Sequence, residues 1–118
     1  MPKQDPSNIL VEAEEITSGA RNRAYGHPKE NHENTAAFWT AYMKRKYGAD
    51  APTLSGRDVC LMMILLKISR DANKETRDNL VDAAGYARNA EMIDEMIGEE
   101  DQLKADQKTL KDFNDTPA

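Results

Sequence analysis

The chain has 118 residues and a formal net charge of −5 at pH 7, with a sequence pI near 5.0. This is the length of one ordinary domain and too short for two well-packed ones. The acidic balance argues against general binding to a nucleic-acid backbone, because such proteins gather lysine and arginine on one surface. Small ligands and other proteins are therefore the expected partners.

No segment of the sequence has the features of a signal peptide or a membrane span. The first residues contain no apolar signal core, and the longest apolar run is far below the roughly 20 residues that cross a bilayer. The single cysteine, Cys60, lies inside the apolar run 59–66 and is expected to be a small buried side chain. We expect a cytoplasmic protein with no membrane attachment.

Helical periodicity recurs in four segments, and no segment shows strand alternation between hairpin turns. The first helix is expected from about Pro6 to Ser18, with Asp5 as its cap. The second is expected from Pro28 to about Lys46. An aromatic-rich side of this second helix, expected to be buried, is formed by Phe38, Trp39, Tyr42 and Met43.

The third helix is expected over about 56–71, after a start at Ser55-x-x-Asp58 that resembles a capping box. It is apolar nearly all round, which places it in the middle of a bundle. The fourth is expected from near Glu75 to about Ile97, with Gly98 as its stop. Gly85 inside it indicates close contact with another backbone or a ligand.

The predicted fold class is therefore all-α, a compact bundle of about four helices. Residues 1–98 are interpreted as a single helical-bundle domain. Residues 99–118 are charged and sparse in large apolar residues, so they are expected to form a C-terminal tail or a marginal fifth helix.

A first group of candidate ligand-binding residues precedes and enters the second helix. A loop that leads into a helix N-terminus presents unpaired backbone N–H groups. Arg21 in this loop can clamp a phosphate, Tyr25 can stack on a base or sugar, and Asn31 follows on the helix. The alternative is that Arg21 pairs with an acidic helix while Tyr25 covers the core.

A second group joins the end of the third helix to the fourth. Asp78, Asp82 and Tyr86 follow each other at intervals of four residues, so they form a polar stripe on one helical face. Lys67 and Arg70 come near the start of that helix through the short connection. Carboxylates beside cations can hold Mg²⁺ and phosphate together, but structural ion pairing explains the same residues.

Two further pairs carry weaker signals. Glu12 and Glu15 lie three residues apart on the first helix and can bind a hard cation if a third acid faces them, although such a pair is more often a solvated face. His27 and His32 are five residues apart, a poor spacing for one metal, and are interpreted as surface or capping histidines.

Taken together, the polar residues and their spacing resemble a family of small phage and prophage proteins of unassigned function. The resemblance covers about residues 8–90 and rests on the spaced residues Ile9, Leu10, Glu12, Ala13, Ile16, Arg21, Tyr25, Gly26, Pro28, Asn31, Trp39, Asp58, Val59, Met62, Met63, Leu66, Lys67, Arg70, Asp78, Asp82, Gly85, Tyr86 and Ala87. A phage origin implies that the protein acts in the cytoplasm of the host cell.

That family is in turn distantly similar to the all-α MazG-like nucleoside-triphosphate pyrophosphohydrolases. The similarity implies Mg²⁺ held by an E-x-x-E helix and a later acidic pair while water attacks a phosphate. Glu12 and Glu15 have the first spacing, and Asp78 and Asp82 stand one residue wider than the second. The resemblance thus assigns metal binding to these four acids, and catalysis to Asp78 and Asp82.

Three functional hypotheses follow. The first is a phage accessory protein that binds a nucleotide or another small phosphorylated ligand, with or without Mg²⁺-dependent pyrophosphohydrolase activity. The second is a non-catalytic sponge for a nucleotide signal of host defence. The third is an adaptor or inhibitor that binds a host protein. In each case a homo-oligomer is expected, because assembly would help to cover the apolar third helix.

Overall fold

The computed structural model of the chain describes residues 8–18 and 26–116. This part of the chain is all-α and contains no strand, which confirms the predicted fold class. Its four helices are α1 (Ile9–Thr17), α3 (Pro28–Tyr47), α4 (Gly56–Asn73) and α5 (Arg77–Asp115). None of these helices is both long and apolar enough to cross a membrane.

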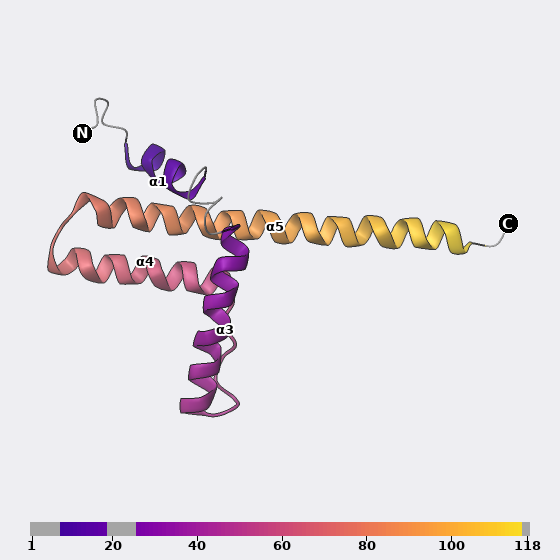
Figure 1. Cartoon of the computed structure of the whole chain (residues 1–118), viewed down its shortest axis with the longest axis horizontal. Helices are drawn as coiled ribbons and strands as arrows, with labels where there is room; N and C mark the ends of the chain where they lie inside the picture. The colour runs from indigo at the N-terminus through magenta and orange to yellow at the C-terminus, as the bar shows by residue number, and fades with distance from the viewer. Residues whose placement is uncertain (1–7, 19–25, 117–118) are drawn as a thin grey trace.

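The first half of α5 is the element on which the other helices pack. α4 runs back along one side of α5, α1 lies on the opposite side, and α3 crosses near the junction and points away (Figure 1). The most apolar helix, α4, touches only α5 and α3 among the described helices. The prediction that this helix lies in the middle of the bundle is therefore wrong, because α1 packs on α5 and no described helix covers the outer side of α4.

The molecule is more extended than the predicted compact bundle. Its radius of gyration is 19.2 Å and its principal extents are 68 × 45 × 21 Å, whereas a compact domain of this length has a radius of gyration of about 13.5 Å. The far half of α5 and the far half of α3 both project from the junction (Figure 1). Two free helix ends therefore account for the elongated shape.

Side-chain caps define where the first two helices begin. Asn8 Oδ1 accepts hydrogen bonds from the backbone N–H groups of Leu10 and Val11, both at 3.0 Å. This cap starts α1 at Ile9, later than the predicted start at Pro6, and the predicted cap Asp5 lies outside the described residues. α3 begins at Pro28 as predicted, and His27 Nδ1 accepts from the N–H of Lys29 at 3.0 Å.

The starts of α4 and α5 are fixed in the same way. Ser55 Oγ accepts from the Asp58 N–H at 3.1 Å, and the Asp58 carboxylate accepts from the Ser55 N–H at 2.8 Å, which confirms the predicted capping box. Thr76 Oγ1 accepts from the Asn79 N–H at 3.2 Å, so α5 starts slightly later than predicted. The Asp71 carboxylate accepts from the Thr76 N–H at 3.1 Å and ties the α4–α5 turn to the end of α4.

The helix that was expected to stop at Gly98 continues through it to Asp115. A glycine inside a helix costs about 1 kcal/mol relative to alanine, and good helix formers on both sides outweigh that cost. Pairs at i and i+4 add support, such as Lys108 with Asp112 at 2.9 Å. The segment 99–115 is thus a continuation of α5 and neither a tail nor a separate helix.

The buried core is small and lies between α4 and α5. Cys60, Ala90 and Ile93 form one cluster, with Tyr86 packed against it. The predicted burial of Cys60 is confirmed. The aromatic-rich side of α3 is only partly buried, since Phe38 is 76% and Tyr42 61% exposed whereas Trp39 and Met43 are half-buried. These residues lie beyond the part of α3 that packs on its neighbours, whose buried members are Pro28, His32 and Ala36.

α1 is held on α5 by both packing and charge. Its Ala13 and Thr17 are buried, and a Cβ added to Gly85 of α5 would lie 3.5 Å from the Thr17 methyl carbon. Ion pairs flank this contact: Arg77 with Glu12, and Arg88 with Glu14 at 3.2 Å. The neighbour of Gly85 is thus a side chain of α1 at an ordinary van der Waals distance, whereas the sequence predicted close contact with another backbone or a ligand.

Gly56 and Gly98 form a matched pair for testing this packing. A Cβ at Gly56 would lie 3.0 Å from the backbone nitrogen of Glu33, whereas one at Gly98 would meet no atom within 4 Å. We expect Gly56→Ala to lower the free energy of unfolding by about 1–3 kcal/mol through overpacking. Gly98→Ala should raise helicity without lowering that free energy. Urea unfolding followed by circular dichroism measures both, and equal effects of the two substitutions would contradict the α3–α4 contact.

Burial raises the pKa of the Cys60 thiol to about 11. The reactive form of cysteine is the thiolate, so the folded protein should react very slowly with a thiol reagent at about pH 8, where a free cysteine is partly ionised. Unfolding in denaturant should restore rapid reaction. Equal labelling rates in the folded and unfolded protein would show that Cys60 is accessible.

Candidate functional site

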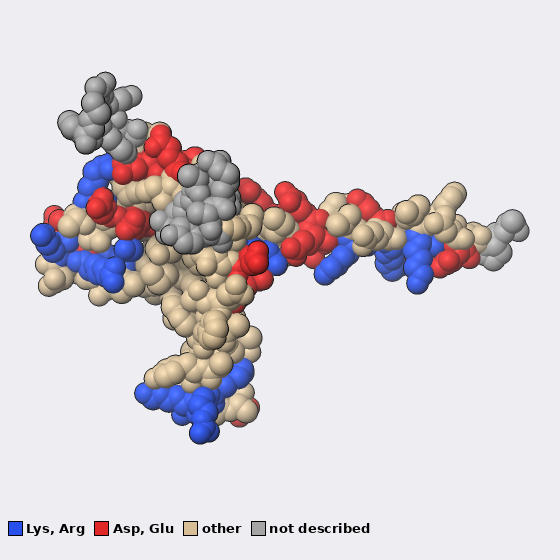
Figure 2. All heavy atoms as spheres, in the orientation of Figure 1, with Lys and Arg blue, Asp and Glu red and all other residues tan. Residues whose placement is uncertain are grey.

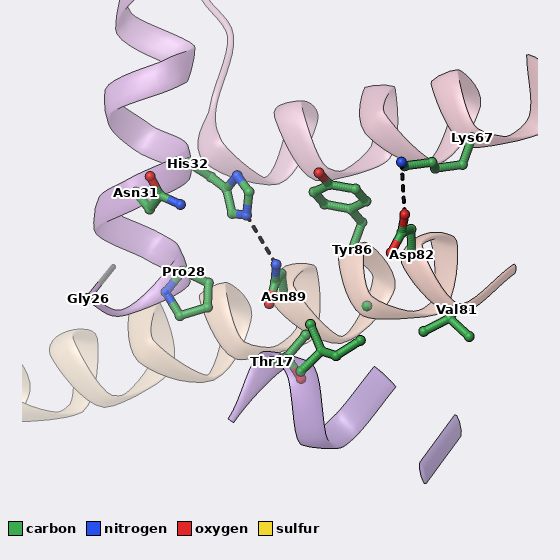
Figure 3. A pocket seen from close by; sticks show the side chains of 12 residues that line it. Thr17, Gly26, Pro28, Asn31, His32, Lys67, Val81, Asp82, Tyr86 and Asn89 are labelled. Atoms are coloured by element: carbon green, nitrogen blue, oxygen red, sulfur yellow. Dashed lines mark hydrogen bonds and ion pairs between the residues drawn. The ribbon is translucent and has the colours of Figure 1, made fainter. Parts of the chain in front are cut away.

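A cleft of about 230 Å³ lies at the junction of the four helices. α1 and α5 supply one side, the start of α3 a second, and a lysine from α4 reaches in from a third (Figure 3). The lining is mixed polar and apolar. Within the described part of the chain, the lining residues are Ile16, Thr17, Gly26, Pro28, Asn31, His32, Lys67, Val81, Asp82, Gly85, Tyr86 and Asn89.

One end of the cleft carries an ion pair between α4 and α5. Lys67 Nζ lies 2.9 Å from Asp82 Oδ2, and the Lys67 side chain is only 13% exposed. The register of the helical hairpin causes this contact, because Lys67 lies near the end of α4 and Asp82 in the second turn of α5. The pair brings a cation to the cleft and partly neutralises it there.

Two helices meet through a histidine and an asparagine at the other end. His32 of α3 is buried, and its Nε2 lies 3.2 Å from Nδ2 of Asn89 on α5. The Tyr86 ring lies between this pair and the Lys67–Asp82 pair (Figure 3). Its centroid is 6.0 Å from that of His32, at an interplanar angle of 63°, which is an edge-to-face contact.

Asn89 has a polar atom without a hydrogen bond. Within the described residues its Oδ1 is buried and has no partner. Rotating the amide by half a turn would place Oδ1 against the histidine and leave Nδ2 unpaired instead, so either orientation leaves one group unsatisfied. Such a group costs about 1–3 kcal/mol, and it lies in a side chain that lines the cleft.

The structure brings together four of the predicted site residues. Asn31, Lys67, Asp82 and Tyr86 all line the cleft. Arg21 and Tyr25 lie outside the described residues, so their predicted contacts stay predictions. Arg70 and Asp78 are exposed and are not part of the cleft lining.

The four acids that the MazG resemblance assigns to metal do not gather at one point. Glu12 pairs with Arg77 and Asp82 with Lys67, while Glu15 and Asp78 are exposed. Across residues 8–18 and 26–116, no group of three or more histidine, cysteine, aspartate or glutamate side chains is placed to hold a metal ion. This arrangement does not fit a Mg²⁺ ion held by carboxylates. The metal-binding and catalytic roles of the four acids therefore stay predictions.

His32, Asn89 and Thr17 were not among the predicted site residues. The interpretation of His32 as a surface or capping histidine is wrong, whereas His27 does cap a helix. Asn89 could have been found by extending the stripe Asp78, Asp82, Tyr86 by one more turn along the same face. No local signal marks His32 or Thr17, because their place in the cleft depends on how α1 and α3 pack on α5.

The sequence matches a family model over residues 8–94, described as Domain of unknown function (DUF6378). The chain belongs to this family. The matched span contains every residue that lines the cleft and ends within α5, so the helical segment 95–115 lies beyond it.

Two curated relatives are phage proteins. The chain is 48% identical over 81 residues to the Gene 55 protein of Mycobacterium phage L5, a match that covers 68% of this chain and 48% of that protein. It is 38% identical over 87 residues to the Gene 55 protein of Mycobacterium phage D29, covering 73% of this chain and 53% of the relative. The chain thus spans about half the length of these relatives, and no solved structure matches it.

The Lys67–Asp82 pair can be tested with a double-mutant cycle. We expect Lys67→Met and Asp82→Asn to couple by about 0.5–1 kcal/mol in the free energy of unfolding, because one partner is largely buried and the other is partly solvated. The coupling should weaken in high salt. Strict additivity of the two substitutions in low-salt urea unfolding would show that the pair makes no net contribution.

Proposed function

We propose that this protein binds a small, polar, nucleotide-derived ligand in the four-helix cleft. The observation that carries the proposal is the unpaired amide oxygen of Asn89, in a cleft that is also lined by an aromatic ring and a lysine. Ligand sites typically combine an apolar lining with a few convergent polar groups. Buried polar atoms in native proteins rarely lack a hydrogen-bond partner. A bound ligand that donates a hydrogen bond to Oδ1 of Asn89 explains why an asparagine occupies this position.

The size of the cleft limits what it can enclose. Its volume of about 230 Å³ is below the roughly 300–1,000 Å³ of pockets that bury drug-sized ligands. The cleft therefore accommodates one moiety, such as a base or a sugar, and leaves phosphate groups at its mouth. The soft terminal torsion of Asn89 lets its amide turn toward an N–H or acceptor group of that moiety.

Lys67 and Tyr86 supply the remaining recognition chemistry. The Tyr86 ring offers an apolar surface to a flat base, and its hydroxyl offers a hydrogen-bonding group. Lys67 can turn from Asp82 to a phosphate oxygen, since a lysine ammonium is a compact charge on a flexible stem. Asp82 disfavours a phosphate directly beside it, so Lys67 must turn away from Asp82 to bind a phosphate at the mouth of the cleft.

The described residues favour binding of the nucleotide without its hydrolysis. The acids expected to hold Mg²⁺ are paired with cations or dispersed, and among the described residues of the cleft no other group is arranged as a nucleophile with its base. We therefore favour a phage accessory protein that sequesters a nucleotide signal over a pyrophosphohydrolase. Similarity to two phage proteins supports the phage context.

The first experiment is to incubate the purified chain with nucleoside mono-, di- and triphosphates and cyclic nucleotides, with and without Mg²⁺. Mass spectrometry of the bound and released species then identifies what was held and whether it changed. Intact nucleotide bound in stoichiometric amount is the expected result. Release of monophosphate and pyrophosphate would establish hydrolysis instead, and absence of all binding would redirect attention to a protein partner.

Substitution of Asn89 tests the site itself. We expect Asn89→Ala to weaken binding of the captured nucleotide at least tenfold, because loss of a hydrogen bond in a cleft costs about 1.5 kcal/mol or more. The matched control is Asn34→Ala, at an exposed position of α3 outside the cleft. Titration calorimetry measures both, and equal affinities for the two variants, each folded by circular dichroism, would place the ligand elsewhere.

A further inference from the structure

The free end of α3, residues 38–47, is rich in exposed aromatic side chains, and we call this segment the α3 tip (Figure 1). Four of the seven aromatic residues of the chain lie in it. Phe38, Tyr42 and Tyr47 are 76%, 61% and 69% exposed. Aromatic rings contribute strongly to cores and interfaces when they are buried, but these three contribute little to the core of the described chain.

The α3 tip is also basic. Residues 34–49 contain Lys44, Arg45 and Lys46 and no acidic side chain, and the first acid beyond them is Asp50 in the following loop. The basic cluster lies at the free end of α3 in Figure 2. In the described part of the chain, neither Arg45 nor Lys46 forms an ion pair with a carboxylate. The net charge of −5, from which general nucleic-acid binding was not expected, therefore hides a local positive excess.

Stabilisation of the helix explains these charges but not the rings. Cations in the last turn interact favourably with the helix dipole. Lys44 Nζ also donates hydrogen bonds to the backbone oxygens of Ala49 and Ala51, at 3.2 and 2.7 Å, and holds the loop against the helix end. Neither role requires exposed aromatic side chains, so the combination of rings and cations indicates an interaction surface.

The rings and the cations share one side of α3. Phe38, Tyr42 and Arg45 follow each other at i, i+4 and i+7, which places them on one helical face. Lys46 Nζ lies 5.8 Å from the centroid of the Tyr42 ring and 5.6 Å from that of Tyr47, within the range of a cation–π contact. The α3 tip thus presents flat rings directly beside positive charge.

We propose that the α3 tip binds single-stranded nucleic acid, with unpaired bases stacked on Phe38 and Tyr42 and phosphates contacted by Arg45 and Lys46. Sites for single strands combine positive charge along the backbone with aromatic rings on which bases stack. A single strand suits the rings better than a duplex, because only unstacked bases offer their faces to aromatic side chains. The inference does not rest on the ligand of the cleft, since none of these four side chains lines it.

The mixing of rings and cations on one face distinguishes this partner from a membrane surface. A helix that lies on a membrane places its apolar rings on one face and its cations on the other. An acidic protein segment would pair with the cations but would leave the rings without flat groups to stack on. The acidic remainder of the chain repels a polyanion, so binding should be confined to the α3 tip and should depend strongly on salt.

The test is the fluorescence anisotropy of a labelled single strand of about 12 thymidines, a length within the range of known single-strand sites. We expect the logarithm of the binding constant to fall with the logarithm of the salt concentration at a slope of about −1.4. The reason is that each of two phosphate contacts, to Arg45 and Lys46, contributes about −0.7 for a single strand. The same strand annealed to its complement should bind at least about fivefold more weakly, since its bases cannot stack on the rings.

Two matched pairs of substitutions locate the site. Tyr42→Ala should weaken binding at least about fivefold through lost stacking. Phe113→Ala removes a ring that is 78% exposed on the free end of α5 and should leave binding unchanged. Arg45→Gln should make the salt slope shallower by about 0.7, whereas Lys111→Gln, at an exposed position of α5, should not alter it. Circular dichroism checks that each variant is folded.

Several results would overturn the proposal. These are no binding of the single strand at low salt, equal affinity for single strand and duplex, and equal effects of Tyr42→Ala and Phe113→Ala. Equal displacement of the labelled strand by polyglutamate and by unlabelled single strand would show that only charge is recognised. Capture of the chain by phosphatidylserine vesicles through Tyr42, without binding of the oligonucleotide, would make the α3 tip a membrane site instead.

Discussion

The packing of three helices around the first half of α5 is the constraint on which the rest of the structure depends. α1 and α4 lie on opposite sides of α5, and α3 crosses near its middle. Small side chains make this approach feasible, with Gly85 against Thr17 of α1 and Ala90 beside Cys60 of α4. Helices that meet a common axis in different directions cannot fill the space at their junction completely, and the cleft lies there.

The polar groups of this cleft have two opposite effects, since some join the helices and one costs stability. The Lys67–Asp82 pair joins the consecutive helices α4 and α5, and the His32–Asn89 contact joins α3 to α5 across 57 residues, so they help to fix how α3 and α4 sit on α5. The unpaired atom of Asn89 is the clearest departure from a core optimised for stability. Departures of this kind are expected at functional sites, where local stability is exchanged for recognition.

The same fold leaves both sides of α4 apolar but covers only one. The other described helices do not cover the outer side of α4, because α1 is short and packs on α5, and α3 points away from α4. Among the described helices none covers this remaining apolar area, and exposed apolar area of this kind is typical of an interaction surface.

The sequence by itself determined the four helices, the N-caps of α3 and α4, and part of the candidate site. Ser55 with Asp58, and Pro28 after His27, are local signals whose physical basis lies within one turn of chain. The stripe from Asp78 to Tyr86 and the nearness of Lys67 also follow from helical spacing and a short connection. The sequence analysis ended this helix at Gly98, but α5 continues to Asp115, because the summed helix propensity of residues 99–115 outweighs the cost of one glycine. Only the tertiary structure decided that α5 is central, that His32 and Asn89 meet, and that Phe38 and Tyr42 are exposed, because these depend on the directions in which the helices cross, and periodicity carries no information about those directions.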